Sequence, residues 1–207
     1  MWEAMAHGFM LALGLILPLG AQNVFVFNQG AVQPTLWRAL PVVITAALCD
    51  TLLILLAVLG VSLVVLTFAW LKTILFAVGV CFLTYMGFIT WRSKPTIDKQ
   101  EAERFTPRRQ IVFAASVSLL NPHAILDTIG VIGTSSLQYS DSLKWGFALT
   151  CILVSWLWFL SLAIVGRGAG RLDPSGKLLR GMNIISALII WAIALYMATS
   201  LLGELFF

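Results

Sequence analysis

Long apolar stretches recur along the whole chain, and they limit its fold more than any other feature. A bilayer core about 30 Å thick needs roughly 20 apolar residues for one helical crossing. Six stretches are of this kind: about Met5–Phe27, Ala39–Leu66, Thr73–Trp91, Gln110–Gly133, Trp145–Gly166 and Gly181–Gly203. Their apolar character is continuous and does not alternate with a period of two, which favours helices over the strands of a membrane barrel. The sequence therefore predicts an all-α integral membrane protein with six transmembrane helices.

The composition excludes the soluble classes of protein. Only 11% of the 207 residues are charged, whereas soluble domains carry about 25%. So few charges cannot cover a soluble domain, which excludes a soluble enzyme, a disordered chain and a nucleic-acid-binding protein. We expect one transmembrane domain over residues 1–207. Cys49, Cys81 and Cys151 lie in apolar stretches without paired spacing, so we expect buried thiols and no disulfide, metal or cofactor.

The basic residues predict how the helices are oriented in the membrane. Of the 13 Lys and Arg residues, 11 lie in the first, third and fifth connections, and only Lys72 and Lys144 lie in the others. The positive-inside rule places those three connections in the cytoplasm and both termini outside. We interpret the longest connection, 92–109, as a solvated loop, with binding of anionic membrane lipid as the alternative. A re-entrant first stretch, which leaves five full spans, also fits this charge distribution.

The tryptophans fall into two groups by depth. The first group lies near the ends of the stretches, where amphipathic rings prefer the headgroup layer: Trp2, Trp37, Trp70, Trp91 and Trp145. The second group lies in the middle of stretches, where we expect packing roles: Trp156, Trp158 and Trp191.

The first and fourth stretches share an unusual interruption. The first reads Leu-Pro-Leu-Gly-Ala-Gln-Asn over 17–23, and the fourth reads Asn-Pro-His-Ala-Ile-Leu-Asp over 121–127. In each, a polar residue follows the proline by five positions. Proline removes a backbone donor and breaks the helix. We therefore expect helix breaks at Pro18 with Gly20, and at Pro122.

The spacing of these two interruptions predicts an internal repeat. Three stretches separate them, an odd number, so the two halves would cross the membrane in opposite senses. The sequence thus predicts two inverted three-helix repeats, 1–91 and 110–207, with helices one and four broken. Inverted repeats with matched broken helices indicate a transport site near the middle of the membrane.

Two aspartates, Asp50 and Asp127, lie inside these stretches. A charged Asp near the bilayer centre costs about 2.5–3.5 kcal/mol on insertion scales. Each must face the bundle interior, pair with a cation or stay protonated. No Lys or Arg lies in the middle of a stretch, so a cationic substrate or protons would complement them. The alternative is that they only form hydrogen bonds across the bundle.

Amides and one histidine accompany the aspartates on the same two stretches. Gln22 and Asn23 lie on the first, and Asn121 and His123 on the fourth. With the two aspartates they are our candidates for substrate binding or proton coupling. Asn121-Pro122 is typical of a helix start, whose N–H groups and dipole favour a carboxylate. Acids for a cation and a helix end for a carboxylate predict an amino-acid substrate with a positive side chain. His123 is either a proton relay or substrate contact, or a satisfied interior histidine.

Three motifs resemble the LysE/ArgO-type basic amino-acid exporters over essentially the whole chain. They are the segments 17–30 and 120–127, and Ala47-Leu48-Cys49-Asp50. The resemblance implies an inner-membrane exporter of L-arginine or L-lysine in a bacterium. It also implies that Asp50, Asp127 and the Asn121-Pro122 region matter for transport. Ala21 stands where proline is common in that family.

Energetics favour exchange of the substrate with protons. An inside-negative potential retains a cation by about 2.3 kcal/mol per charge per 100 mV, and exchange of one proton for one monocation removes this term. Alternatives are an exporter of another amino acid or small cation, a scaffold subunit that transports nothing, and an intramembrane enzyme. The enzyme needs Asp50 and Asp127 close enough to share a proton. A homo-oligomer is left open, because Gly166 and Gly170 are only a weak association signal.

Overall fold

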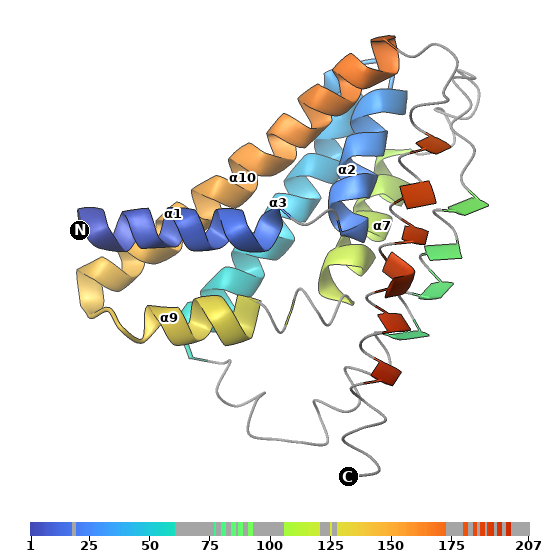
Figure 1. Ribbon diagram of the computed structural model, residues 1–207. Coiled ribbons are helices and arrows are strands. Elements are labelled where there is room, and N and C mark those ends of the chain that lie inside the picture. The colour runs from blue at the N-terminus through green and yellow to red at the C-terminus, as the bar shows by residue number, and fades with distance from the viewer. Residues whose placement is uncertain are drawn as a thin grey trace.

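The computed structural model of the chain is built from helices (Figure 1). It describes residues 1–17, 20–60, 106–120, 125 and 128–172, with single positions between 77 and 92 and between 180 and 199. Within these ranges the elements are α1 Trp2–Ile16, α2 Ala21–Val32, α3 Leu36–Val58, α7 Pro107–Leu119, the π-helix η1 Thr128–Gly133, α9 Thr134–Ser136 and α10 Asp141–Leu172. No strand occurs among them, so the predicted helical class is confirmed.

Two of the described helices, α3 and α10, are long and apolar enough to cross a membrane. The pair α1–α2 is a third candidate if it counts as one span. At a rise of about 1.5 Å per residue, the 23 residues of α3 are enough for a core about 30 Å thick. The chain is thus a multi-pass helical protein. The number of six spans and the inverted repeat stay predictions, because much of the third and sixth stretches lies outside the described residues.

The first predicted span is divided into two helices. α1 ends at Ile16, and α2 begins after Gly20, which is its N-cap residue. The axes of the two helices differ by 80°. This geometry is that of a broken span or of a re-entrant segment, the two alternatives that the sequence left open. Pro18 lies outside the described residues, so its part in the break stays a prediction.

Two predicted spans have different limits in the structure. α3 ends at Val58, not at the predicted Leu66. Gly60 follows it with φ of 83°, a left-handed conformation that glycine adopts without steric cost. The apolar run continues past this glycine, which is why hydropathy alone placed the end too late. α10 extends beyond its predicted span at both ends, because polar residues that flank an apolar run can continue a helix.

The fourth predicted span is not one continuous α-helix within the part of the chain that is described. α7 begins with Thr106 as its N-cap, whose hydroxyl accepts the backbone N–H of Arg109 at 3.5 Å. It ends at Leu119, and η1 begins at Thr128. Of the motif 121–127, only Ile125 is described. The predicted break at Pro122 lies outside the described residues.

Two apolar cores lie along α10. The first joins residues of α2, α3, α7 and α10: Phe25, Val26, Phe27, Val42, Val43, Ala46, Ala47, Ala114, Phe159, Leu162 and Ala163. The second joins α1, α3, η1 and α10: Ala4, Ala12, Ile54, Val58, Ile132, Phe147, Ala148, Cys151 and Val154. On α3 the cores leave a gap between Ala47 and Ile54, and on α10 between Val154 and Phe159. Polar side chains occupy this gap.

Helices α2 and α10 approach each other closely through glycines. A Cβ atom on Gly166 would lie 2.2 Å from the carbonyl oxygen of Phe27, and one on Gly170 would lie 2.4 Å from that of Ala31. Gly30 is equally close to α10 from the other side, at 2.3 Å from the carbonyl oxygen of Ala163. The glycine pair of α10 therefore serves contact within the chain, as small residues do in membrane helices.

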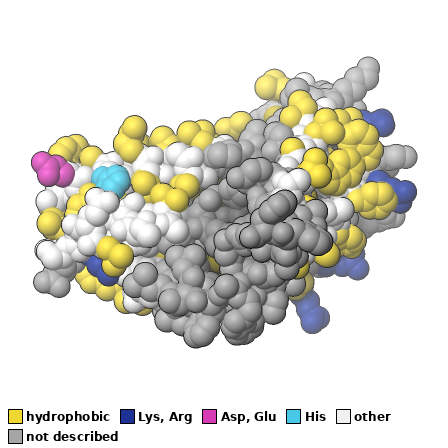
Figure 2. Space-filling view, turned by 60° about the horizontal axis from the view of Figure 1, so that its bottom comes forward, with side chains coloured by type: hydrophobic (Ala, Val, Ile, Leu, Met, Phe, Trp, Pro, Cys, Tyr) yellow, Lys and Arg dark blue, Asp and Glu magenta, His cyan; other side chains and the backbone are white. Residues whose placement is uncertain are grey.

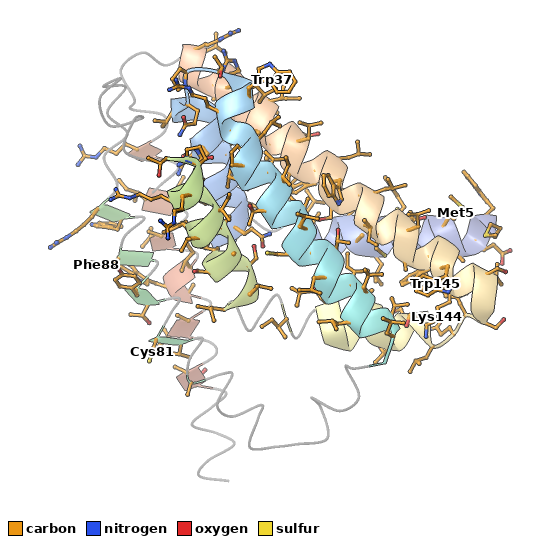
Figure 3. All side chains as sticks on the ribbon, turned by 180° about the vertical axis from the view of Figure 1, so that it is seen from behind. Met5, Trp37, Cys81, Phe88, Lys144 and Trp145 are labelled. Carbon is orange, nitrogen blue, oxygen red and sulfur yellow. The ribbon has the colours of Figure 1, made fainter. Side chains whose placement is uncertain are left out.

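Basic side chains gather at the end of the molecule where α2 and α10 finish and α3 and α7 begin. There the Gln110 amide donates to the Arg38 carbonyl at 3.0 Å, and the Arg167 guanidinium donates to the Pro34 carbonyl at 3.2 Å. Figure 2 shows most of the visible Lys and Arg side chains on this side and an acidic side chain at the opposite end. Trp37 and Trp145 also lie at opposite ends (Figure 3), and their headgroup positions stay a prediction. Which end faces the cytoplasm stays a prediction.

Candidate functional site

Asp50 lies on α3 in the gap between the two apolar cores. Its Oδ2 accepts the Ser155 hydroxyl of α10 at 2.8 Å, and its Oδ1 accepts the Gln22 side-chain amide of α2 at 3.2 Å. Ser155 is buried, and Asp50 and Gln22 are half-buried. Asp50 therefore faces the bundle interior, as expected for a carboxyl that avoids lipid. Both of these partners are neutral, so neither compensates a negative charge.

Ser155 is a site residue that the sequence did not reveal. Serine in an apolar helix commonly donates to its own backbone one turn back, as Ser161 does to the Leu157 carbonyl at 2.7 Å. Only the packing of α10 against α3 turns Ser155 toward a carboxylate. The one available signal was its spacing from Trp158, because residues three apart lie on one face of a helix.

A second contact joins the residues that directly follow Asp50 on α3 and Ser155 on α10. The Trp156 indole N–H donates to the Thr51 hydroxyl at 3.1 Å, and that hydroxyl donates to the Ala47 carbonyl at 2.7 Å. Trp156 is exposed on the surface of the protein, and in the middle of an apolar span, where water is absent, its indole N–H needs an acceptor. The prediction that the mid-stretch tryptophans serve packing is therefore incomplete. Trp191 likewise donates, to the Thr84 carbonyl at 3.2 Å.

A third contact involves Asn23, the predicted amide next to Gln22. Asn23 is buried, and its Nδ2 donates to the Ile16 carbonyl at 2.7 Å. Its Oδ1 accepts the Trp158 indole N–H at 3.3 Å. Together these three sets of contacts form what we call the polar layer: Gln22, Asn23, Asp50, Thr51, Ser155, Trp156 and Trp158.

The polar layer contains three of the predicted site residues, Asp50, Gln22 and Asn23. Asp127, Asn121, His123 and Pro122 lie outside the described residues. Gly20 is the N-cap residue of α2, with φ of −75°. Gln22, which follows in the first turn of that helix, is thus the predicted amide that reaches Asp50.

The thiols and histidines give no metal centre in the described part of the chain, where no group of three His, Cys, Asp or Glu could hold an ion. Cys49 and Cys151 are buried as expected. Cys81 is exposed, so the prediction of a buried side chain is wrong there. His7 lies away from the polar layer, where its Nδ1 is 2.8 Å from the Tyr139 hydroxyl.

Comparison with known proteins identifies the family. The family model described as LysE type translocator matches residues 13–201. The Bacillus subtilis protein named "Putative amino-acid transporter YisU" is 58% identical over 199 residues, which cover 96% of this chain and 90% of that protein. The Arginine exporter protein ArgO of Salmonella paratyphi A is 33% identical over 93% of this chain and 92% of its own length. ArgO of Klebsiella pneumoniae is also 33% identical, over 96% and 95%. No solved structure matches. The chain belongs to the LysE type translocator family.

Proposed function

We propose that the chain exports a basic L-amino acid, arginine or lysine, across the bacterial inner membrane in exchange for protons. The observation that carries this proposal is the Asp50 carboxylate in the polar layer, held by two neutral donors. A carboxylate offers about four lone-pair positions, and Gln22 and Ser155 use two of them. The other positions suit the N–H groups of a cationic side chain or a proton.

The relatives support the substrate class. Arginine exporters are 33% identical to this chain over nearly their whole length. The name of the Bacillus subtilis relative specifies an amino acid without saying which one. A deep carboxylate with neutral neighbours favours a cationic amino acid over a neutral one, because an unpaired buried charge is costly.

Exchange with protons follows from the energetics of the membrane. The inside-negative potential opposes outward movement of a cation by about 2.3 kcal/mol per 100 mV. One inward proton against one outward monocation moves no net charge. We propose that Asp50 and Asp127 bind substrate cation and proton in alternation while the two halves rock.

The rest of the proposal concerns residues and topology beyond the described structure. Six spans in two inverted repeats would place Asp127 opposite Asp50 near the membrane centre. Asn121 and Pro122 would start a half-helix facing the substrate carboxylate, and His123 would relay protons or contact substrate. The basic connections would face the cytoplasm, and both termini would face outward.

Transport by the purified protein in liposomes tests both parts of this proposal. Labelled arginine, lysine and citrulline, the neutral analogue of arginine, are followed with and without an imposed pH gradient. We expect arginine or lysine flux to respond to the gradient and citrulline flux to stay at the level of empty liposomes. Arginine and lysine flux that ignores the gradient contradicts proton exchange, and equal citrulline flux contradicts recognition by charge.

Asp127 needs its own test. We expect Asp127→Asn to abolish export while the protein remains in the membrane, since the amide can carry neither the charge nor the proton. Retained export would remove Asp127 from the site.

A further inference from the structure

The side chain of Asn23 joins three helices at the break between α1 and α2. Its Nδ2 donates a hydrogen bond to the Ile16 carbonyl at 2.7 Å, and its Oδ1 accepts one from the Trp158 indole N–H at 3.3 Å. Only 5% of Asn23 is exposed, so both ends of its amide act inside the protein. Asn23 therefore links the end of α1, the start of α2 and the middle of α10.

A helix that ends inside a membrane protein needs such a contact. The last four carbonyl groups of an α-helix have no partner within the helix, and in an apolar interior each unsatisfied group costs several kcal/mol. α1 ends at Ile16, so the Asn23 amide satisfies one of these carbonyls. The same contact fixes where α2 begins relative to α1. The axes of these two helices differ by 80°.

Through its hydrogen bond to Asn23, Trp158 ties the α1–α2 junction to α10. It lies three residues after Ser155, on the same face of α10, and Ser155 contacts Asp50. Gln22, which precedes Asn23 on the first turn of α2, contacts the other oxygen of Asp50. The Asn23–Trp158 contact thus joins α2 to α10 directly, and the two Asp50 contacts join the same two helices through α3. The residues involved are one apart on α2 and three apart on α10.

We propose that Asn23 and Trp158 are positioning residues that hold the broken ends of α1 and α2 on α10 and thereby set Gln22 against Asp50. The proposal rests on the proposed function in that Asp50 binds the transported cation. It gives Asn23 a role in the geometry of the site in place of the predicted substrate contact.

The first arm of the test measures position without transport. Backbone hydrogen exchange of the α1–α2 junction, residues 13–24, is compared in purified wild-type protein, Trp158→Phe and Asn23→Ala. The matched control is Trp156→Phe, the same change two residues away on α10, which removes the contact to Thr51. We expect exchange in this segment to rise by about tenfold in both variants, the size of one lost hydrogen bond, and to match wild type in the control.

The second arm measures arginine transport by the same samples in liposomes, per folded molecule. We expect KM to rise by about threefold to tenfold in Trp158→Phe and Asn23→Ala and Vmax to change less. Hydrogen exchange in Trp158→Phe and Asn23→Ala that matches the Trp156→Phe control overturns the proposal. Raised hydrogen exchange with an unchanged KM also overturns it, since the contact would then stabilise the fold without positioning the site. Retained export by Asp50→Asn would instead contradict the proposed function, while the hydrogen-exchange comparison of the Asn23 and Trp158 variants would still stand.

Discussion

Helices α2 and α10 meet in two regions that are built in opposite ways. At the start of α2, side chains join the helices through Asn23 and Trp158, and through Gln22 and Ser155 on the shared carboxylate of Asp50. At the end of α2, Gly30, Gly166 and Gly170 bring the two backbones together, with no room for a Cβ atom. The first region joins the helices by hydrogen bonds between side chains, whereas the second joins them by close backbone packing that an added Cβ atom would disrupt. We call the second region the glycine contact; it depends on shape alone, whereas the polar layer also depends on the charge of Asp50.

The largest effect should come from the charge in the polar layer. Asp50→Asn keeps the shape and an oxygen for Ser155 but removes the negative charge. We expect arginine export to fall by about 30-fold or more, since loss of one partner of a buried charge pair costs about 2–5 kcal/mol. Glu3→Gln, on an exposed residue of α1, is the matched control. Export of Asp50→Asn at the level of Glu3→Gln would contradict the role of this charge.

The glycine contact is tested by Gly166→Ala. Its Cβ would lie 2.2 Å from the Phe27 carbonyl oxygen, so the helices must separate, at a cost of about 1–3 kcal/mol as in other overpacked cores. Gly168→Ala is the control, because nothing lies within 4 Å of a Cβ there. Thermal unfolding of both purified variants should show a lower midpoint for Gly166→Ala alone. Equal midpoints would mean that α2 and α10 are not this close.

Part of the fold and part of the polar layer could be predicted from the sequence. The helical class follows from continuous apolar stretches, and the interior position of Asp50 follows from the cost of a charge in lipid. Gln22 was predicted as a site amide because it shares a stretch with the interruption. These are local properties, which a single segment reveals.

The parts that were missed depend on which helix faces which. Ser155 resembles Ser161 in sequence, yet only Ser155 meets a carboxylate. Gly166 and Gly170 gave a weak signal for association, and the partner proved to be α2 of the same chain. The early end of α3 depends on the backbone conformation of Gly60, which hydropathy does not report.

Ser155→Ala should have an intermediate effect, because it removes one of two donors to Asp50 and leaves the charge. A hydrogen bond to a charged group is worth about 1.5–3 kcal/mol, so we expect KM for arginine to rise by about tenfold. Ser161→Ala makes the same change on α10 where the hydroxyl bonds only to its own helix. An unchanged KM in Ser155→Ala would show that Gln22 alone positions the carboxylate.

The smallest effect should come from the neighbouring contact that lacks a charge. Thr51→Val keeps the side-chain volume but removes the hydroxyl that accepts the Trp156 indole N–H. A neutral hydrogen bond contributes about 0.5–1.5 kcal/mol, so we expect a slightly lower unfolding midpoint and an unchanged KM for arginine. Thr51 follows Asp50 directly on α3 and Trp156 follows Ser155 on α10, so the two contacts differ mainly in charge. A KM that rises as much as in Ser155→Ala would mean that the charge of Asp50 is not what distinguishes these contacts. The polar layer would then act through packing, as the glycine contact does.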